Sequence, residues 1–101
     1  FFAEQSAQKS LKAFLIFRGM RSVMIHAVGE LVKSAAELEE MFSPFIERGK
    51  RLDRHYLASR YPDALPEPAI PAESYVKEEA EDAVSIARDI FNTCAPLVKA
   101  D

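Results

Sequence analysis

The chain has 101 residues, of which 49% are hydrophobic and 29% are charged. This length and composition are typical of one globular domain, and the chain is too short for two. The 13 Lys and Arg residues stand against 16 Asp and Glu residues, which gives a net charge of −3. That balance excludes a globally basic nucleic-acid-binding protein, so any such function must be confined to a local surface.

The single cysteine, Cys94, cannot form an intramolecular disulfide, and no Cys/His cluster with zinc-ligand spacing occurs. No apolar stretch approaches the ~20 residues of a membrane helix. Glycine-rich phosphate loops and the usual hydrolase motifs are also missing from the sequence. We therefore expect a protein of the reducing cytoplasm that uses no metal or other cofactor.

Apolar residues recur at steps of three and four, which predicts an all-α fold. The first helix is predicted at residues 1–18, and Gly19 is expected to end it because glycine tolerates a left-handed backbone. No Ser, Thr, Asp or Asn cap precedes Phe1, which favours a further helix upstream. The apolar stripe of this helix consists of Ala3, Ala7, Leu11, Phe14 and Leu15.

A second helix is predicted to begin near residues 22–26 and to continue to Phe42. Ser43 is a good N-cap and Pro44 suits the first helical position, so a third helix should open there and extend through Tyr56. Gly49 falls on the apolar stripe of this third helix, and we expect it to face the core or a neighbouring backbone.

Four prolines between Pro62 and Pro71 predict an ordered loop over residues 59–73. Ser74 is the expected N-cap of the last helix, which Pro96 should kink or end near Asn92. The predicted buried stripe of this helix consists of Ala80, Ala83, Val84, Ala87, Ile90, Phe91 and Cys94. Together these elements predict an up-and-down bundle of four to five helices with a proline-rich loop before the last one.

The charges are unevenly distributed along the chain. Residues 47–60 hold two acids and five bases, whereas residues 61–101 hold nine acids and three bases. The segment 47–60 is therefore a local basic region of +3 on an otherwise acidic chain, and it is the most distinctive feature of the sequence.

On a helix, Arg48, Arg51 and His55 share one face, and Lys50 and Arg54 lie on an adjacent strip. Arginine binds phosphate oxygens in a bidentate manner, and an imidazole exchanges protons near neutral pH. This combination suits the binding of RNA phosphodiesters, or their cleavage without a metal.

Each of these residues also has a simpler interpretation. The arginines of a solvated helix face would pair with Asp53 and Glu47, and basic runs are usually such faces. His26, close to a helix start, would be a capping or core histidine, and Tyr56 would close the core. The acidic pairs near the start of the last helix are interpreted as dipole stabilisers without histidine partners; they are Glu78, Glu79, Glu81 and Asp82.

Several separated motifs resemble the HEPN domain family. Residues 1–14 resemble an early helix of that family. Leu52-Asp53-Arg54-His55-Tyr56, then Arg60-Tyr61-Pro62-Asp63-Ala64, and then residues 78–83 ahead of an apolar stripe are similar to its C-terminal half. The resemblance covers nearly the whole chain.

The resemblance implies an all-α bundle that is usually dimeric and is commonly encoded beside a minimal nucleotidyltransferase. Many members are metal-independent ribonucleases that use an Arg, four to six intervening residues, and a His. Arg48 and His55 fit this spacing, although Gly49 stands where the family usually has a polar residue. Arg51 is one residue too close, and Arg21 with His26 is the second choice.

Three functions follow as hypotheses. The first is a homodimeric module that binds nucleotide or single-stranded RNA phosphate, a minimal nucleotidyltransferase, or both, with Lys50, Arg54, Tyr56 and Arg60 as the phosphate-binding residues. The alternative is a toxin-type, metal-independent endoribonuclease in which His55 is the general acid and base and Arg48 or Arg51 stabilises the phosphate. The third is a structural dimer without a ligand.

Overall fold

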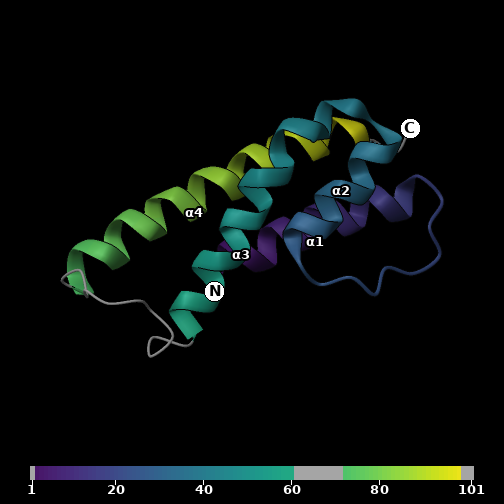
Figure 1. Cartoon of the computed structure of the whole chain (residues 1–101). Coiled ribbons are helices and arrows are strands. Elements are labelled where there is room, and N and C mark those ends of the chain that lie inside the picture. The colour runs from purple at the N-terminus through teal and green to yellow at the C-terminus, as the bar shows by residue number, and fades with distance from the viewer. Residues whose placement is uncertain (1, 61–71, 99–101) are drawn as a thin grey trace.

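The computed structural model describes residues 2–60 and 72–98, and over these ranges it contains four α-helices and no strand. α1 and α4 pack together, as do α2 and α3, and α4 extends along the whole molecule (Figure 1). The prediction of an all-α fold is confirmed. The elements are α1 (Phe2–Phe17), α2 (Val28–Leu38), the 3₁₀ helix η1 (Glu40–Phe45), α3 (Ile46–Arg60), α4 (Ala72–Cys94) and the 3₁₀ helix η3 (Ala95–Val98).

A single apolar core joins all four α-helices. It contains the fully buried Phe14 and Phe42 rings, whose centroids lie 4.9 Å apart and whose planes are tilted by 44°, a favourable geometry for two aromatic rings. Full burial of each large side chain contributes about 1.5–3 kcal/mol to folding. The other fully buried large side chains are Leu11, Leu15, Leu31, Leu52, Ile86, Ile90, Val28, Val32 and Cys94.

The first helix ends as predicted. Gly19 has a φ of +110°, the left-handed region that favours glycine. The Met20 N–H donates to the Leu15 carbonyl at 3.1 Å, which satisfies one of the last carbonyls of α1. The chain then continues without regular structure over residues 20–27 and arcs away from the bundle (Figure 1).

The predicted start of the second helix was wrong. Residues 22–26 are not helical, and α2 begins at Val28. Its first two N–H groups, those of Val28 and Gly29, donate to the two carboxylate oxygens of Asp53, each at 2.9 Å. Asp53 therefore performs the role of an N-cap from 24–25 residues away.

The boundary between the second and third helices also differs from the prediction. α2 ends at Leu38, and Phe42, Ser43 and Pro44 all belong to η1, which continues directly into α3. Ser43 therefore does not open a helix, because its backbone is already inside one.

The prediction for Gly49 is confirmed. A Cβ added there would lie 3.1 Å from the Gly29 Cα, so the backbones of α2 and α3 are in direct contact at this point.

The loop predicted over residues 59–73 is too long at both ends. Ser59 belongs to α3, and α4 already begins at Ala72, which places Ser74 inside α4 rather than at its cap. The four prolines of that loop lie outside the described residues. At its other end α4 continues to Cys94, two residues beyond the predicted stop, and Pro96 lies in η3.

The buried stripe of α4 is narrower than predicted. Ala83, Ala87, Ile90 and Cys94 are buried as expected, and Ile86 joins them. Ala80 is exposed, Val84 is 49% exposed and Phe91 is 52% exposed. α4 therefore presents a second, partly apolar face to solvent.

Candidate functional site

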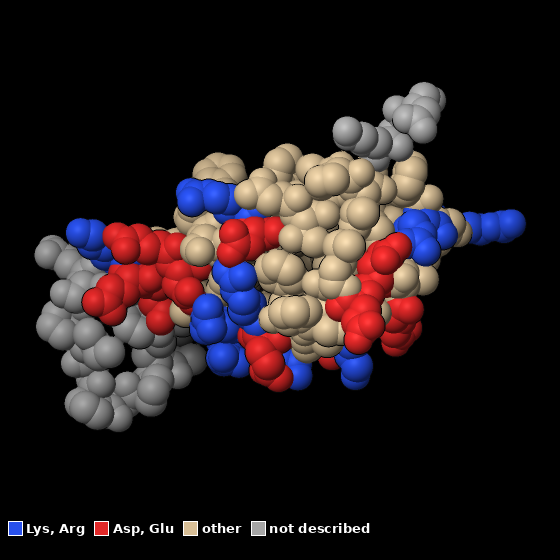
Figure 2. Space-filling model, turned by 90° about the horizontal axis from the view of Figure 1, so that it is seen from above, with Lys and Arg blue, Asp and Glu red and all other residues tan. Residues whose placement is uncertain are grey.

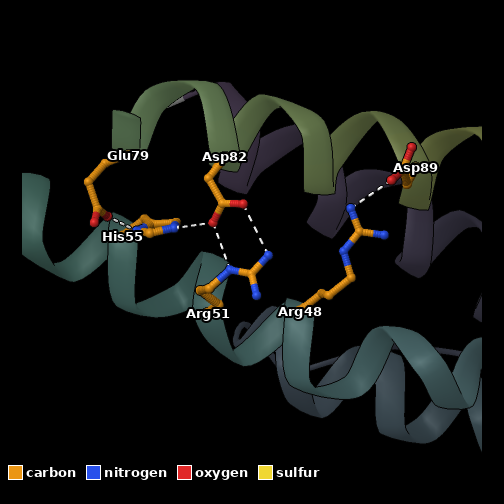
Figure 3. A network of polar contacts seen from close by, with 6 residues as sticks. All are labelled: Arg48, Arg51, His55, Glu79, Asp82 and Asp89. Carbon is orange, nitrogen blue, oxygen red and sulfur yellow. Dashed lines mark hydrogen bonds and ion pairs between the residues drawn. The ribbon is translucent and has the colours of Figure 1, made fainter. Parts of the chain in front are cut away.

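The cations of α3 point in two directions. Arg48, Arg51 and His55 face α4 and contact its carboxylates (Figure 3), and we call these three residues the inner face. Lys50 and Arg54 are exposed on the adjacent strip, and we call these two residues the outer strip. The grouping follows from the helical spacing, as predicted.

Arg51 forms a bidentate pair with Asp82. Arg51 Nε donates to Asp82 Oδ2 at 2.7 Å, and Arg51 Nη2 donates to Asp82 Oδ1 at 3.0 Å. The hydrogen bond from Arg51 lowers the pKa of Asp82, and His55 lowers it further. The same hydrogen bond raises the pKa of Arg51. Both groups therefore stay charged near neutral pH.

His55 lies between two carboxylates of α4 (Figure 3). Its Nε2 atom lies 2.6 Å from Asp82 Oδ2, and its Nδ1 atom contacts Glu79 Oε2. The side chain is only 10% exposed. Both ring nitrogens therefore face carboxylate oxygens, which accept hydrogen bonds. In this arrangement neither nitrogen is open to take a proton from a substrate hydroxyl.

These contacts correct the prediction that the acids of α4 lack histidine partners, because Glu79 and Asp82 both contact His55. They also correct the predicted pairing of the arginines with Asp53, which instead caps α2.

Arg48 completes the inner face. Its Nη2 atom donates to Asp89 Oδ2 at 2.6 Å, and its guanidinium carbon lies 5.4 Å from the centre of the Phe45 ring. The ion pair and the cation–π contact both compete with an added phosphate for this arginine.

The positive charges of the outer strip have fewer acidic partners than those of the inner face. Lys50 Nζ lies 3.6 Å from Glu47 Oε1, beyond hydrogen-bond length, and both side chains are largely exposed. Within the described ranges Arg54 has no ion pair or hydrogen bond. Figure 2 shows basic and acidic side chains interleaved on one face of the molecule, so any phosphate site is local.

Two further predicted residues are only partly placed. Tyr56 is half-buried and lines a cleft beside α1. Arg60 is the last residue of α3, and the prediction for its side chain lies outside what the structure describes.

The second predicted pair, Arg21 and His26, is not assembled. Both are exposed on the non-helical segment before α2, and no hydrogen bond or ion pair joins them in the described structure. His26 Nδ1 lies 3.4 Å from Lys12 Nζ. The interpretation of His26 as a capping or core histidine was therefore wrong.

Cys94 is buried, as the sequence predicts, and burial raises its pKa to about 11, so it is not a thiolate at neutral pH. Over residues 2–60 and 72–98 no three His, Cys, Asp or Glu side chains are grouped to hold a metal ion. In the same ranges no helix is both long and apolar enough to cross a bilayer.

The family model of the HEPN domain matches residues 1–97. The chain belongs to the HEPN family. Searches of curated proteins and of solved structures found no match. The match confirms the resemblance to this family. HEPN domains are helical and are associated with nucleotide or RNA binding and with ribonuclease activity.

In this HEPN domain the acidic partners of the inner face were not predicted from the sequence. Glu79, Asp82 and Asp89 share one side of α4, at i, i+3 and i+10. α3 and α4 are antiparallel at this contact. His55 therefore meets Asp82, whereas Arg48, earlier on α3, meets Asp89, later on α4. The sequence thus contains a basic stripe on α3 and an acidic stripe on α4. It does not show that these two stripes face each other.

Proposed function

We propose that this HEPN domain binds the phosphate groups of a nucleotide or of single-stranded RNA through the outer strip of α3. The observation that carries the proposal is the division of the cations of α3. Asp89 and Asp82 neutralise Arg48 and Arg51, whereas Arg54 is exposed without a described acidic partner.

Chemistry favours the same assignment. Arg54 presents a planar fork of donors that matches phosphate oxygens, and Lys50 lies one helical turn away and adds a point charge. Because both side chains are exposed, binding depends on screened Coulomb attraction and weakens as salt is added.

The test is fluorescence anisotropy with a labelled short single-stranded RNA and with a labelled nucleotide, at low salt. Arg54→Glu with Lys50→Glu should weaken RNA binding by about tenfold or more, because two phosphate contacts become repulsive. Lys33→Glu, at an exposed lysine on α2, is the control for charge reversal at another surface and should bind nearly as the parent does. Equal affinities for the parent and the double variant would contradict the proposal.

The endoribonuclease is less well supported. A general base needs a free nitrogen within hydrogen-bond reach of the hydroxyl that it deprotonates, and both nitrogens of His55 face carboxylates. We expect end-labelled RNA to remain intact with this protein in EDTA. Cleavage that is lost in His55→Ala would establish the nuclease instead.

A minimal nucleotidyltransferase is the protein partner that the family resemblance implies, and we assign it to the same outer strip. Co-purification with such a partner should be weakened by Arg54→Glu and unaffected by Lys33→Glu.

We also propose that the protein is a homodimer that pairs through the outer side of α4. Glu81, Val84, Arg88 and Phe91 are exposed there at steps of three and four. If two copies of α4 lie antiparallel about a twofold axis between residues 84 and 85, Glu81 of one copy meets Arg88 of the other, twice. Val84, which lies beside the axis, then supplies the apolar contact with its counterpart.

A further inference from the structure

A cleft of about 420 Å³ lies between α1, α3 and the segment before α2. This volume is within the range of small-molecule sites. Most of the surface that lines it is apolar, although carboxylate and amide side chains reach it; the lining residues are Glu4, Gln5, Gln8, His26, Ala27, Asp53, Tyr56 and Leu57. Lys50 and Arg54 do not line it, so the cleft is distinct from the outer strip.

Glu4 is an unusual group for such a cleft. Its side chain lines the cleft although the residue is only 3% exposed. Gln8 Nε2 donates to Glu4 Oε2 at 3.3 Å, whereas Glu4 Oε1 is buried and receives no hydrogen bond in the described structure. A buried side-chain oxygen without a hydrogen-bond partner destabilises the folded protein, because it has lost its contact with water and gained none in return.

A second carboxylate, that of Asp53, lies beside Glu4. Burial first, and then the hydrogen bond to Asp53 and its negative charge, raise the pKa of Glu4 to about 8. Near neutral pH Glu4 therefore keeps its proton, which the Asp53 carboxylate accepts as a hydrogen bond, and the pair carries one negative charge. Asp53 is also fixed from its other side by the N–H groups of Val28 and Gly29.

Any other positive group that reaches the pair can replace this proton. An ammonium has three N–H donors. One can bond the Glu4 carboxylate, one can bond the Asp53 carboxylate, and the third can bond the side-chain carbonyl of Gln5 or Gln8. The Ala27 and Leu57 side chains and the Tyr56 ring line the cleft and can contact the uncharged body of such a ligand.

The other charged and titratable groups at the cleft limit the ligand to a single charge. His26 lines the cleft from the segment before α2 and contacts Lys12 of α1, which disfavours a second cation there. Tyr56 is the titratable group that α3 adds beside Asp53. No described group of α4 lines the cleft.

We infer that this cleft is a binding site for a small organic monocation, a primary amine whose ammonium group replaces the proton shared by Glu4 and Asp53. Binding then releases that proton from Glu4 to solvent. The site is independent of the phosphate function proposed for the outer strip.

Isothermal titration calorimetry with butylamine tests the inference, and butanol is the uncharged probe of the same shape. Butylammonium should bind and butanol should not. Its affinity should rise about tenfold per pH unit from about pH 6 and level off above about pH 8, where Glu4 is already ionised. Titrations in two buffers of different ionisation enthalpy should show close to one proton released at the lower pH.

Glu4→Gln is the decisive variant, because glutamine imitates the neutral acid and should preserve the fold. It should lose at least tenfold in affinity for butylammonium, whereas Glu30→Gln, at an exposed position of α2, should not. Absence of butylammonium binding at millimolar concentration would overturn the inference. Equal binding of butanol, or unchanged binding by Glu4→Gln, would overturn it as well. RNA binding by the outer strip is measured separately and is unaffected by any of these results.

Discussion

At Glu4, burial and a neighbouring carboxylate both oppose ionisation. The folded protein holds this proton to about pH 8, whereas an unfolded chain releases it near the usual value of 4.5. The contribution of Glu4 to stability is thus fully present below about pH 4.5 and is lost progressively as the pH rises to about 8.

The variant Glu4→Gln isolates this effect, since the amide is neutral at every pH and can still donate to Asp53. We expect it to be no more stable than the parent at acidic pH and increasingly more stable as the pH approaches 8. Thermal unfolding followed by circular dichroism across this range checks the difference between the two proteins. A difference that does not change with pH would show that Glu4 is ionised in the folded state.

The contribution of Asp82 to stability depends on pH in the opposite direction. Its pKa is lowered by Arg51 first and by His55 second, so its contribution is present above the ordinary pKa and is lost as the pH falls through the folded value. Because the side chain is 33% exposed, solvent screening limits the contribution to about 1 kcal/mol. A double-mutant cycle of Arg51→Gln and Asp82→Asn should give a coupling of about 0.5–1 kcal/mol near neutral pH that disappears in acid. A coupling of zero near neutral pH would contradict the ion pair.

At the scale of the elements, some helix ends are determined locally and others are not. The end of α1 was predictable because Gly19 is itself the residue with a positive φ. The start of α2 was not, because its N–H groups are satisfied by Asp53, which follows them by 24–25 residues. The neighbouring residue, Ala27, makes no side-chain cap bond.

The contact between α2 and α3 depends on glycine at two positions. A Cβ at Gly49 would lie 3.1 Å from the Gly29 Cα and 3.2 Å from its nitrogen, and backbone atoms cannot move aside as a flexible side chain can. Gly49→Ala should therefore destabilise the protein by about 1–3 kcal/mol, despite the better helix propensity of alanine. Chemical denaturation measures this, with the exposed Glu37→Ala on α2 as the control. A stabilised Gly49→Ala variant would show that α2 and α3 are not in backbone contact.

At the scale of the whole molecule, the sequence predicted the fold class, the core face of α1 and the two-sided arrangement of cations on α3. It did not predict which helix, and which acidic side chains, each side of α3 contacts. His55 and Arg51 are on the predicted face, but their acidic partners became evident only when α4 was placed opposite α3. The exposure of Val84 and Phe91 was missed for a related reason, since an apolar stripe does not tell which part of it another helix covers.

The proposed homodimer is tested by charge at the exposed side of α4. Val84→Glu should convert the dimer to monomer, because it puts two like charges near the proposed twofold axis, and sedimentation equilibrium measures the change. Met24→Glu alters an apolar residue of the segment before α2 that is 79% exposed, and it should leave the assembly intact. Arg88→Glu alone should weaken the dimer, because it replaces the proposed ion pair with two like charges. Combining it with Glu81→Arg, which restores opposite charges, should restore the dimer. A parent protein that is monomeric at high concentration would contradict the dimer.

The proposed phosphate site is the outer strip and not the inner face. The arginine Nε–Hε signals of the ¹⁵N-labelled protein report on it most directly during a titration with short single-stranded RNA in EDTA. We expect the Arg54 signal to shift, while those of Arg48 and Arg51 stay in place because Asp89 and Asp82 hold them. Shifts of Arg48 and Arg51 with a silent Arg54 would contradict the claim and place the phosphate beside His55.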